Sequence, residues 1–192
     1  CILPVHLFGQ CADMTKINEI AKQHNLFVLE DCAQSTGATY DGQKSGQFGD
    51  LGAFSFYPTK LLGAYGDGGM ILTNSAELQD KCRQLRRYGM EGSYYAEEHG
   101  YNSRLDEVQA AILSIKLKSL DDTILRRRQL AAQYFEKLKD TDLVLPVEAD
   151  ANQHAYYLYV VRHAERDRLI DAMAEQDIHL NISYPYPVSL MN

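Results

Sequence analysis

The chain has 192 residues, of which 45% are hydrophobic and 23% charged, so it is long and apolar enough to form a packed core. Its 26 acidic residues outnumber 19 basic ones, and a net charge of −7 argues against a nucleic-acid-binding surface, which needs clustered Lys and Arg. No apolar stretch approaches the roughly 18 residues of a membrane span and no signal peptide precedes the first strand, so we expect a soluble protein.

The first part of the chain predicts alternating strands and helices. Four short apolar runs predict strands: residues 2–7, 26–30, 52–56 and 70–73. Asp13 is suited to cap a helix between the first two strands, and Ser75 to cap a helix that ends near Gly89. Strand, helix and strand at short spacing are typical of a parallel sheet covered on both faces. Residues 1–118 are therefore expected to form part of a large α/β domain.

The second part begins with a long helical pattern. Apolar residues keep helical spacing from Arg104 to Leu138, and only Asp121-Asp122 marks a joint. The Arg126-Arg127-Arg128 run within this pattern is interpreted as a solvated helix face. A strand (155–161), a helix (164–176) and a short strand (178–182) follow. Residues 119–192 are thus predicted to form a helical connection and part of a smaller α/β domain.

Four cysteines, at positions 1, 11, 32 and 82, show neither close pairing nor the spacing of a metal site. Reduced thiols in a cytoplasmic protein without a bound metal are the expectation. Cys32 follows Asp31 directly, and we interpret it as a small packing residue and not as a nucleophile.

One lysine stands out by its surroundings. Lys60 follows the aromatic run Phe54-Ser55-Phe56-Tyr57 and a proline, which fixes its backbone. A lysine partly withdrawn from water can lose its proton and attack an aldehyde, as the cofactor pyridoxal phosphate requires. The ring nitrogen of that cofactor needs a carboxylate partner, and Asp31 at the end of the run 26–30 can supply it. A surface lysine and a capping aspartate are the competing interpretations.

Several phrases in a fixed order resemble the DegT family of nucleotide-sugar aminotransferases, which belongs to the aspartate-aminotransferase fold group. They are Glu30-Asp31-Cys32-Ala33-Gln34, Ser55-Phe56-Tyr57-Pro58-Thr59-Lys60, Gly66-Asp67-Gly68-Gly69 and the run from Gly100 to Ala111. The likeness extends from Pro4 to Pro185. It implies the type I fold of pyridoxal-phosphate-dependent transferases, with a mainly parallel large domain and a smaller α/β domain. Since family members are about twice as long, both domains are expected to be incomplete here.

The resemblance also implies roles for single residues. Lys60 would bind pyridoxal phosphate covalently and move the proton between the substrate carbon and the cofactor, and Asp31 would face the ring nitrogen. Gln34 would lie near the phenolic oxygen and Ser55 would donate to the phosphate. Asn102 would reach the phosphate of a partner subunit, which implies a homodimer with shared sites. Capping and backbone hydrogen bonds are the alternatives for Ser55 and Asn102.

The implied reaction moves an amino group, from glutamate, to a nucleotide-linked keto-deoxysugar. The glycines of the turn Gly66-Asp67-Gly68-Gly69 are expected to permit positive φ. The whole stretch from Leu62 to Gly69 resembles that of enzymes acting at C3 of a dTDP-3-keto-6-deoxyhexose. Such chemistry serves deoxyamino sugar biosynthesis, for example of lipopolysaccharide O-antigen. Ser183 stands where many relatives carry histidine, which leaves the sugar less defined. His154 is interpreted as structural.

Other functions remain open at this stage. Within the same fold the chain could aminate at C4 or act as a pyridoxal-phosphate-dependent sugar dehydratase. Those dehydratases replace the lysine by histidine, so Lys60 argues against that alternative. A catalytically silent relative that regulates is the alternative from another functional class.

Overall fold

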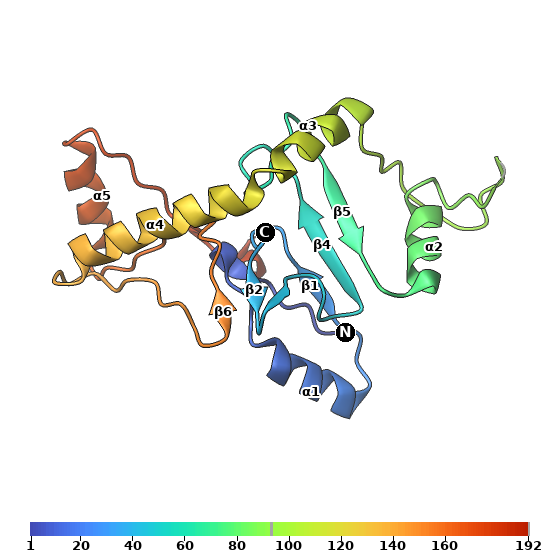
Figure 1. The fold of residues 1–192 in the computed structure, drawn as a ribbon, viewed down its shortest axis with the longest axis horizontal. Helices are drawn as coiled ribbons and strands as arrows, with labels where there is room; N and C mark the ends of the chain where they lie inside the picture. The colour runs from blue at the N-terminus through green and yellow to red at the C-terminus, as the bar shows by residue number, and fades with distance from the viewer. Residues whose placement is uncertain (93, 192) are drawn as a thin grey trace.

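The computed structural model describes residues 1–92 and 94–191. Its fold is mixed α/β, with strands in the middle and helices around them (Figure 1). The helices are α1 (Met14–His24), α2 (Ala76–Leu85), α3 (Glu107–Leu117), α4 (Leu120–Leu138) and α5 (Arg166–Ala174), with short 3-10 turns η1 (Leu7–Gly9) and η2 (Val188–Leu190). The strands are β1 (Leu29–Asp31), β2 (Thr39–Tyr40), β3 (Gln43–Lys44), β4 (Leu51–Ser55), β5 (Gly69–Leu72) and β6 (Asn152–Gln153).

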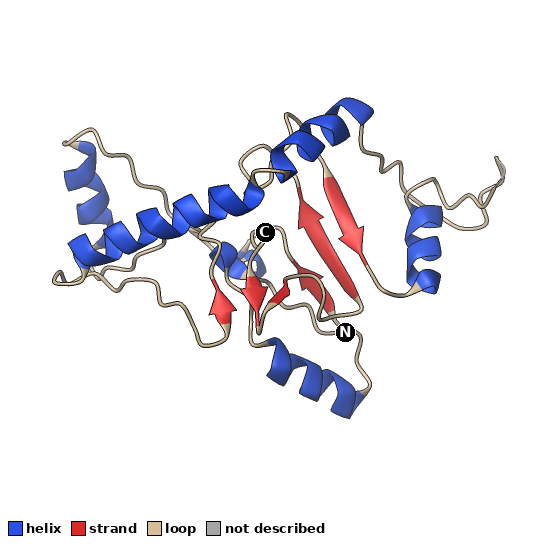
Figure 2. Ribbon diagram, viewed as in Figure 1, coloured by secondary structure: helices blue, strands red, loops and turns tan. Residues whose placement is uncertain are grey.

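The strands form two small sheets (Figure 2). In the first, β4 lies between β1, to which it is parallel, and β5, to which it is antiparallel. The expected parallel pairing is thus found between β1 and β4, whereas β5 runs back along β4. Residues 56–68 between β4 and β5 contain no helix, and a parallel neighbour needs a crossover that is usually helical. The second sheet has the order β3-β2-β6 and is antiparallel.

Residues 2–7 were expected to be a strand but form only two parallel bridges, Ile2 to Val28 and Val5 to Asp31. The ladder stays short because Pro4 has no N–H to donate and because η1 begins at Leu7. These bridges still place the segment directly beside β1.

The predicted helix starts at Asp13 and Ser75 are confirmed. The Asp13 carboxylate accepts a hydrogen bond from the Lys16 N–H at 3.1 Å, and the Ser75 hydroxyl accepts one from the Leu78 N–H at 3.3 Å. The second of these helices, α2, ends at Leu85 and not near Gly89.

The long helical pattern divides into α3 and α4, but not at the predicted joint. The break lies at Lys118 and Ser119, and Asp121 and Asp122 lie in the first turn of α4. Negative charge is favourable there because the helix dipole is positive at that end. In Figure 1 α4 leads from the strands to α5 at the other end of the molecule.

The predicted strands 155–161 and 178–182 are not formed, whereas the helix between them is present as α5. The first segment bonds to a loop instead of a sheet: the Ala155 N–H donates to Gly9 O at 2.8 Å and the Leu158 N–H to Phe8 O at 3.2 Å. An extended segment becomes a strand only beside another strand, and none pairs with 155–161 in the described part of the chain.

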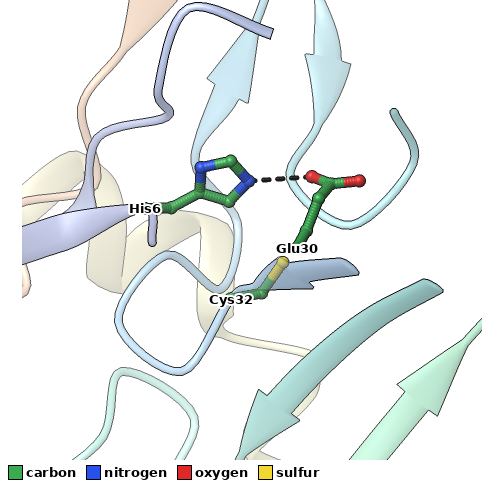
Figure 3. Close-up of side chains that lie close together, drawn as sticks. All are labelled: His6, Glu30 and Cys32. Atoms are coloured by element: carbon green, nitrogen blue, oxygen red, sulfur yellow. Dashed lines mark hydrogen bonds and ion pairs between the residues drawn. The ribbon is translucent and has the colours of Figure 1, made fainter. Parts of the chain in front are cut away.

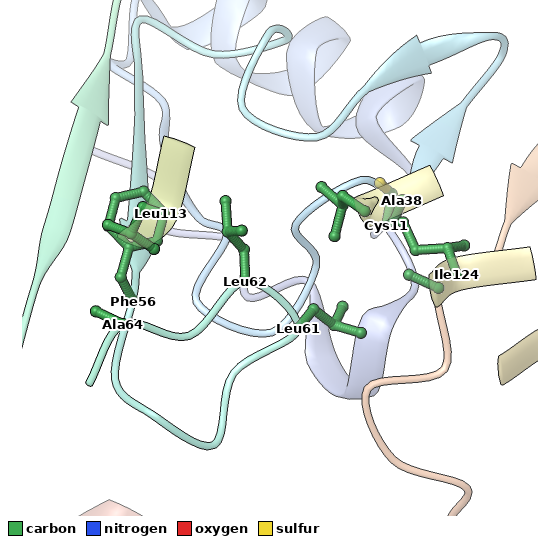
Figure 4. Close-up of a cluster of buried hydrophobic side chains, with 10 residues drawn as sticks. Cys11, Ala38, Phe56, Leu61, Leu62, Ala64, Leu113 and Ile124 are labelled. Atoms are coloured by element: carbon green, nitrogen blue, oxygen red, sulfur yellow. The ribbon is translucent and has the colours of Figure 1, made fainter. Parts of the chain in front are cut away.

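The larger hydrophobic core joins the loop after β4 to α3 and α4 (Figure 4). Leu61, Leu62 and Ala64 of the loop are buried there beside Leu113 and Ile124 of the helices. Burial of each leucine contributes about 1.5–3 kcal/mol, which anchors the loop. In the described residues, no helix is both long and apolar enough to cross a membrane.

Candidate active site

Lys60 lies in a loop that is fixed by a backbone hydrogen bond and by packing into the core. The loop begins where β4 ends at Ser55, the Lys60 N–H donates to Tyr57 O at 2.9 Å, and the next two side chains enter the core. A Cβ added at Gly63 would lie 2.4 Å from the carbonyl oxygen of Pro58. The two ends of the loop therefore approach so closely that only glycine fits, and the lysine sits on a rigid turn.

Helix α3 holds the same loop from the side. The Tyr65 N–H donates to Gln109 Oε1 at 2.9 Å, and Lys116 Nζ donates to the carbonyl oxygen of Gly63. Gln109 has no role that could be predicted from the sequence, although it belongs to one of the recognised phrases. Its position on α3 explains why this phrase and the lysine phrase occur together.

The amine of Lys60 is half-buried and faces an aromatic ring. Nζ lies 4.9 Å from the centroid of the Tyr157 ring, which is a cation–π contact. Among the described residues, no carboxylate forms an ion pair with this amine and no acceptor forms a hydrogen bond with it. The Tyr157 ring thus holds the amine in place, and in the described part of the chain no ion pair or hydrogen bond has to break before the amine binds a ligand.

Asp31 and Ser55 end two neighbouring parallel strands. Asp31 is paired in register with Ala53, two residues before Ser55, so both side chains lie at the same edge of the sheet. Asp31 Oδ1 accepts from the Ala33 N–H at 2.9 Å, and Ser55 Oγ accepts from the Tyr57 N–H at 3.3 Å. Since the serine oxygen is the acceptor in that bond, its own hydrogen is left to donate to a ligand.

Gln34 links this edge to two distant segments. Its Oε1 accepts from the Phe8 N–H at 2.7 Å, and its Nε2 donates to the Tyr184 hydroxyl at 2.6 Å. Phe8 adopts a left-handed conformation with φ of 59°, which turns its N–H toward the glutamine. The sequence predicted neither partner.

Asn102 lies on a different segment from the other four predicted residues. It forms an antiparallel bridge with Arg87, on the exposed segment between α2 and α3. No contact joins it to Lys60 or Asp31 among the described residues. A role in a partner subunit's site requires such a separate, exposed position.

Behind Asp31 lies a buried cluster of His6, Glu30 and Cys32 (Figure 3). His6 Nδ1 accepts from the Ala12 N–H at 3.1 Å, so Nε2 carries the proton and donates to Glu30 Oε2 at 2.8 Å. The backbone N–H groups of residues 46, 48 and 49 also donate to Glu30, at 2.7–2.8 Å. Both carboxylate oxygens are therefore already bonded, and the cluster is a structural anchor for β1.

Electrostatics agree with an ionised Glu30. Burial raises its pKa, but the hydrogen bonds from His6 and from the backbone of Gly49, Gly46 and Phe48 outweigh burial and leave the pKa lowered. Burial raises the pKa of the Cys32 thiol, and nearby Glu30 raises it further. Cys32 is fully buried and stays protonated, as expected of a packing residue. The sequence signal for this anchor was a Glu at an apolar strand position beside Asp31.

The interpretation of the arginine run as a solvated face is wrong for two of its three members. Arg127 donates to the carbonyl oxygens of Tyr156 and Tyr157 at 3.0 and 3.2 Å. Arg128 forms a bidentate pair with Glu148 and donates to the carbonyl oxygen of His154 at 2.8 Å. Unpaired carbonyls of a segment that is not in a sheet need donors, and α4 supplies them. The two arginines thus fix the segment that carries Tyr157.

His154 is structural, as predicted. Its ring is buried, stacks on Tyr156 with centroids 4.0 Å apart, and accepts the Tyr156 N–H at Nδ1. Burial lowers its pKa to about 4, although Glu148 opposes the shift.

The turn at Gly66-Asp67-Gly68-Gly69 needs glycine for a different reason from the one predicted. None of its three glycines has a positive φ. Instead, a Cβ at Gly69 would lie 2.8 Å from Phe54 O, and one at Gly68 would lie 3.0 Å from Leu105. Close approach of a backbone atom therefore excludes a larger residue at Gly69, whereas at Gly68 only the end of the Leu105 side chain would have to move.

The model of the DegT/DnrJ/EryC1/StrS aminotransferase family matches residues 1–192. A dTDP-3-amino-3,4,6-trideoxy-alpha-D-glucose transaminase of Micromonospora megalomicea subsp. nigra is 52% identical over 99% of this chain and 52% of its own. A dTDP-3-amino-3,6-dideoxy-alpha-D-galactopyranose transaminase of Aneurinibacillus thermoaerophilus is also 52% identical, over 97% of this chain and 51% of its own. A "pleiotropic regulatory protein" of Geobacillus stearothermophilus is 50% identical over 98% and 52%. The chain spans about half the length of the curated relatives it matches.

Solved structures show the same relationship. An aminotransferase of this family from Brucella abortus superposes with a TM-score of 0.95 at 41% identity, over 99% of this chain and 51% of that one. NtdA from Bacillus subtilis, whose structure contains its cofactor PMP, superposes with a TM-score of 0.86 at 31% identity, over 96% and 43%.

Proposed function

Because the chain belongs to the DegT/DnrJ/EryC1/StrS aminotransferase family, we propose that it forms part of a pyridoxal-phosphate-dependent sugar aminotransferase. The observation that supports the proposal is the order of three residues about the carboxyl end of β1 and β4. The carboxylate of Asp31 and the hydroxyl of Ser55 end adjacent parallel strands, and Lys60 follows on the rigid loop. Ligands of open α/β sheets bind at the carboxyl ends of the strands.

The residues at this edge fit pyridoxal phosphate in their chemistry. Lys60 offers a primary amine with no ion-pair partner among the described residues, Asp31 has one carboxylate oxygen without a described partner, and Ser55 has an unused hydroxyl hydrogen. These are respectively a partner for an aldehyde, for a protonated ring nitrogen and for a phosphate oxygen. Gln34 adds an amide donor.

Each residue then has a defined task. When bound, pyridoxal phosphate supplies an electron sink for the substrate carbon. Lys60 holds the aldehyde and afterwards carries a proton to and from the substrate carbon, which its rigid loop keeps in reach. Asp31 keeps a proton on the ring nitrogen, and Ser55 fixes the phosphate. The ring of Tyr157 covers one side of the amine and excludes water from that side.

The substrate assignment extends the same proposal. Two relatives at 52% identity are named as transaminases that form 3-amino sugars linked to dTDP. We assign this chain to amination at C3 of a dTDP-3-keto-6-deoxyhexose in the cytoplasm, with glutamate as donor. Residues 1–118 would belong to the cofactor-binding domain and 119–192 to the helical connection and small domain. Asn102 would complete the site of the second subunit of a homodimer.

Reductive trapping tests the proposal. Pyridoxal phosphate and borohydride are added to the whole protein, which is then digested and analysed by mass spectrometry. We expect one irreversibly labelled peptide, containing Lys60, and no such label in Lys60→Ala. Lys118→Ala, which removes an exposed lysine at the end of α3, is the matched control and should label normally. Label spread over surface lysines would contradict the assignment of Lys60.

A second candidate function follows from the relative named as a pleiotropic regulatory protein, which is 50% identical. A regulator could retain the fold and bind a ligand without turnover. Protein that binds pyridoxal phosphate at Lys60 is incubated with glutamate and a panel of dTDP-linked keto-sugars. This experiment distinguishes the enzyme from the regulator. Formation of an amino sugar supports the enzyme, whereas cofactor binding without any product supports the regulator.

A further inference from the structure

Tyr184 links the last ten described residues to the candidate site through a side-chain hydrogen bond. Its hydroxyl accepts a hydrogen bond from Gln34 Nε2 at 2.6 Å, across 150 positions of sequence. The tyrosine is otherwise 57% exposed, so the contact is not a by-product of core packing. Nothing in the roles described above uses this residue.

The orientation of the Gln34 amide is fixed by two bonds of opposite kind. Oε1 accepts from Phe8, whose N–H can only donate, so the oxygen must face that side. Nε2 then faces Tyr184, whose hydroxyl oxygen serves as acceptor. An amide carries two hydrogens on nitrogen, and only one is used here. The second is left for a ligand at the sheet edge.

The anchor on the other side of the amide is itself rigid. Phe8 has a left-handed backbone, and its carbonyl oxygen accepts from Leu158 N–H at 3.2 Å. A Cβ at the following residue, Gly9, would lie 2.7 Å from the Tyr157 nitrogen. The position of the Phe8 N–H that binds Gln34 is therefore fixed by close packing, whereas the position of the Tyr184 hydroxyl can adjust.

We propose that Tyr184 is a positioning residue of the cofactor site, which holds the Gln34 amide so that its free hydrogen points to the bound cofactor. The inference rests on the proposed function. It assigns to the Tyr184-Pro185 segment the role of completing the site from the C-terminal side. Loss of the Tyr184 hydroxyl lets the Gln34 amide rotate about its side-chain bonds. The amide N–H then points to the cofactor only part of the time.

The test compares Tyr184→Phe with Tyr186→Phe in the whole protein. Tyr186 lies two residues away, is 66% exposed, and has no hydrogen bond to Gln34. Pyridoxal phosphate is titrated into each variant and its visible absorbance band is recorded against pH. We expect Tyr184→Phe to bind about fivefold more weakly and to shift the band and its pH profile, as loss of one oriented hydrogen bond predicts. Tyr186→Phe should match the wild type.

A double-mutant cycle with Gln34→Leu decides whether the effect runs through the glutamine. If Tyr184 acts by positioning Gln34, then Tyr184→Phe has no further effect on affinity or spectrum once Gln34 is Leu. Additive effects would overturn the inference, as would an unchanged spectrum in Tyr184→Phe. A wild type that takes up no cofactor and gives no reducible label at Lys60 would instead overturn the proposed function, and this inference with it.

Discussion

The amine of Lys60 lies over the ring of Tyr157, 4.9 Å from its centroid, although 97 positions separate the two residues. The contact exists because α4 fixes the tyrosine segment through Arg127 while α3 fixes the lysine loop through Lys116. Two helices thus bring an aromatic face and an amine together from different parts of the chain.

Tyr157→Leu should make Lys60 react faster with an acylating reagent in protein without cofactor. The ring covers one side of the amine and holds it by a cation–π contact of ~1 kcal/mol, so removing the ring frees the amine for the reagent. We expect about a fivefold higher labelling rate at Lys60, measured by mass spectrometry of the peptide. Tyr157→Phe keeps the ring and should behave as wild type, and Lys118 serves as an internal standard in every variant. Equal rates at Lys60 in the Leu and Phe variants would show that the ring has no effect.

Asp31→Asn should leave the fold and cofactor binding nearly intact while turnover falls by several orders of magnitude. The amide oxygen can still accept from the Ala33 N–H, so the local structure survives. The negative charge that would hold the proton on the ring nitrogen is lost, and with it ~4 kcal/mol or more of transition-state stabilisation. Steady-state kinetics and cofactor titration measure the two effects separately. Near-normal kcat would assign this task to another group.

The local signals of the fold could be predicted from the sequence because they depend on neighbouring residues. Capping by Asp13 and Ser75 needs only the next three residues, and it was predicted correctly. Strand formation at 155–161 depends on a partner elsewhere, and the same apolar pattern serves equally for a segment bonded to the loop at Phe8. Pattern alone cannot distinguish these outcomes.

The residues of the candidate site also divide into those that could be predicted from the sequence and those that could not. Lys60, Asp31 and Ser55 stand in local phrases, so they could be named from the sequence. Their supports could not: Tyr157 and Tyr184 come from segments more than 90 positions away and carry no motif of their own. The buried pair of His6 and Glu30 depends on tertiary hydrogen bonds that no spacing rule encodes.

Gly63→Ala should destabilise the lysine loop. The new Cβ would lie 2.4 Å from Pro58 O and 3.0 Å from Tyr57 O, and both are backbone atoms that cannot move without opening the turn. We expect the free energy of unfolding to fall by about 1–3 kcal/mol in urea titrations, with weaker uptake of pyridoxal phosphate. Gly66→Ala is the control, because its Cβ would meet only the flexible end of Gln109 at 3.0 Å. Equal stability of the two variants would mean that the loop is not as tightly closed as described.

His154 should make the protein lose stability between pH 7 and pH 5. Its pKa is lowered from 6.5 to about 4, first by burial of the ring and also by Arg128, while Glu148 acts in the opposite direction. Above pH 6.5 the ring is neutral in both states. Below it the unfolded chain binds a proton that the folded chain does not, so stability decreases as pH falls toward 4. The expected loss from pH 7 to pH 5 is on the order of 2 kcal/mol.

Urea titrations of the wild type and His154→Phe at pH 7, 6 and 5 measure this loss. The variant should be less stable at pH 7, by about 1–3 kcal/mol, because the Tyr156 N–H loses its acceptor. Its stability should nevertheless decrease less between pH 7 and 5. His163→Asn is the control: Asp142 raises the pKa of His163, so its contribution is fully present below pH 6.5 and is lost only as pH rises. The control should therefore keep the wild-type loss from pH 6 to 5, and the same loss in His154→Phe would show that another group causes it.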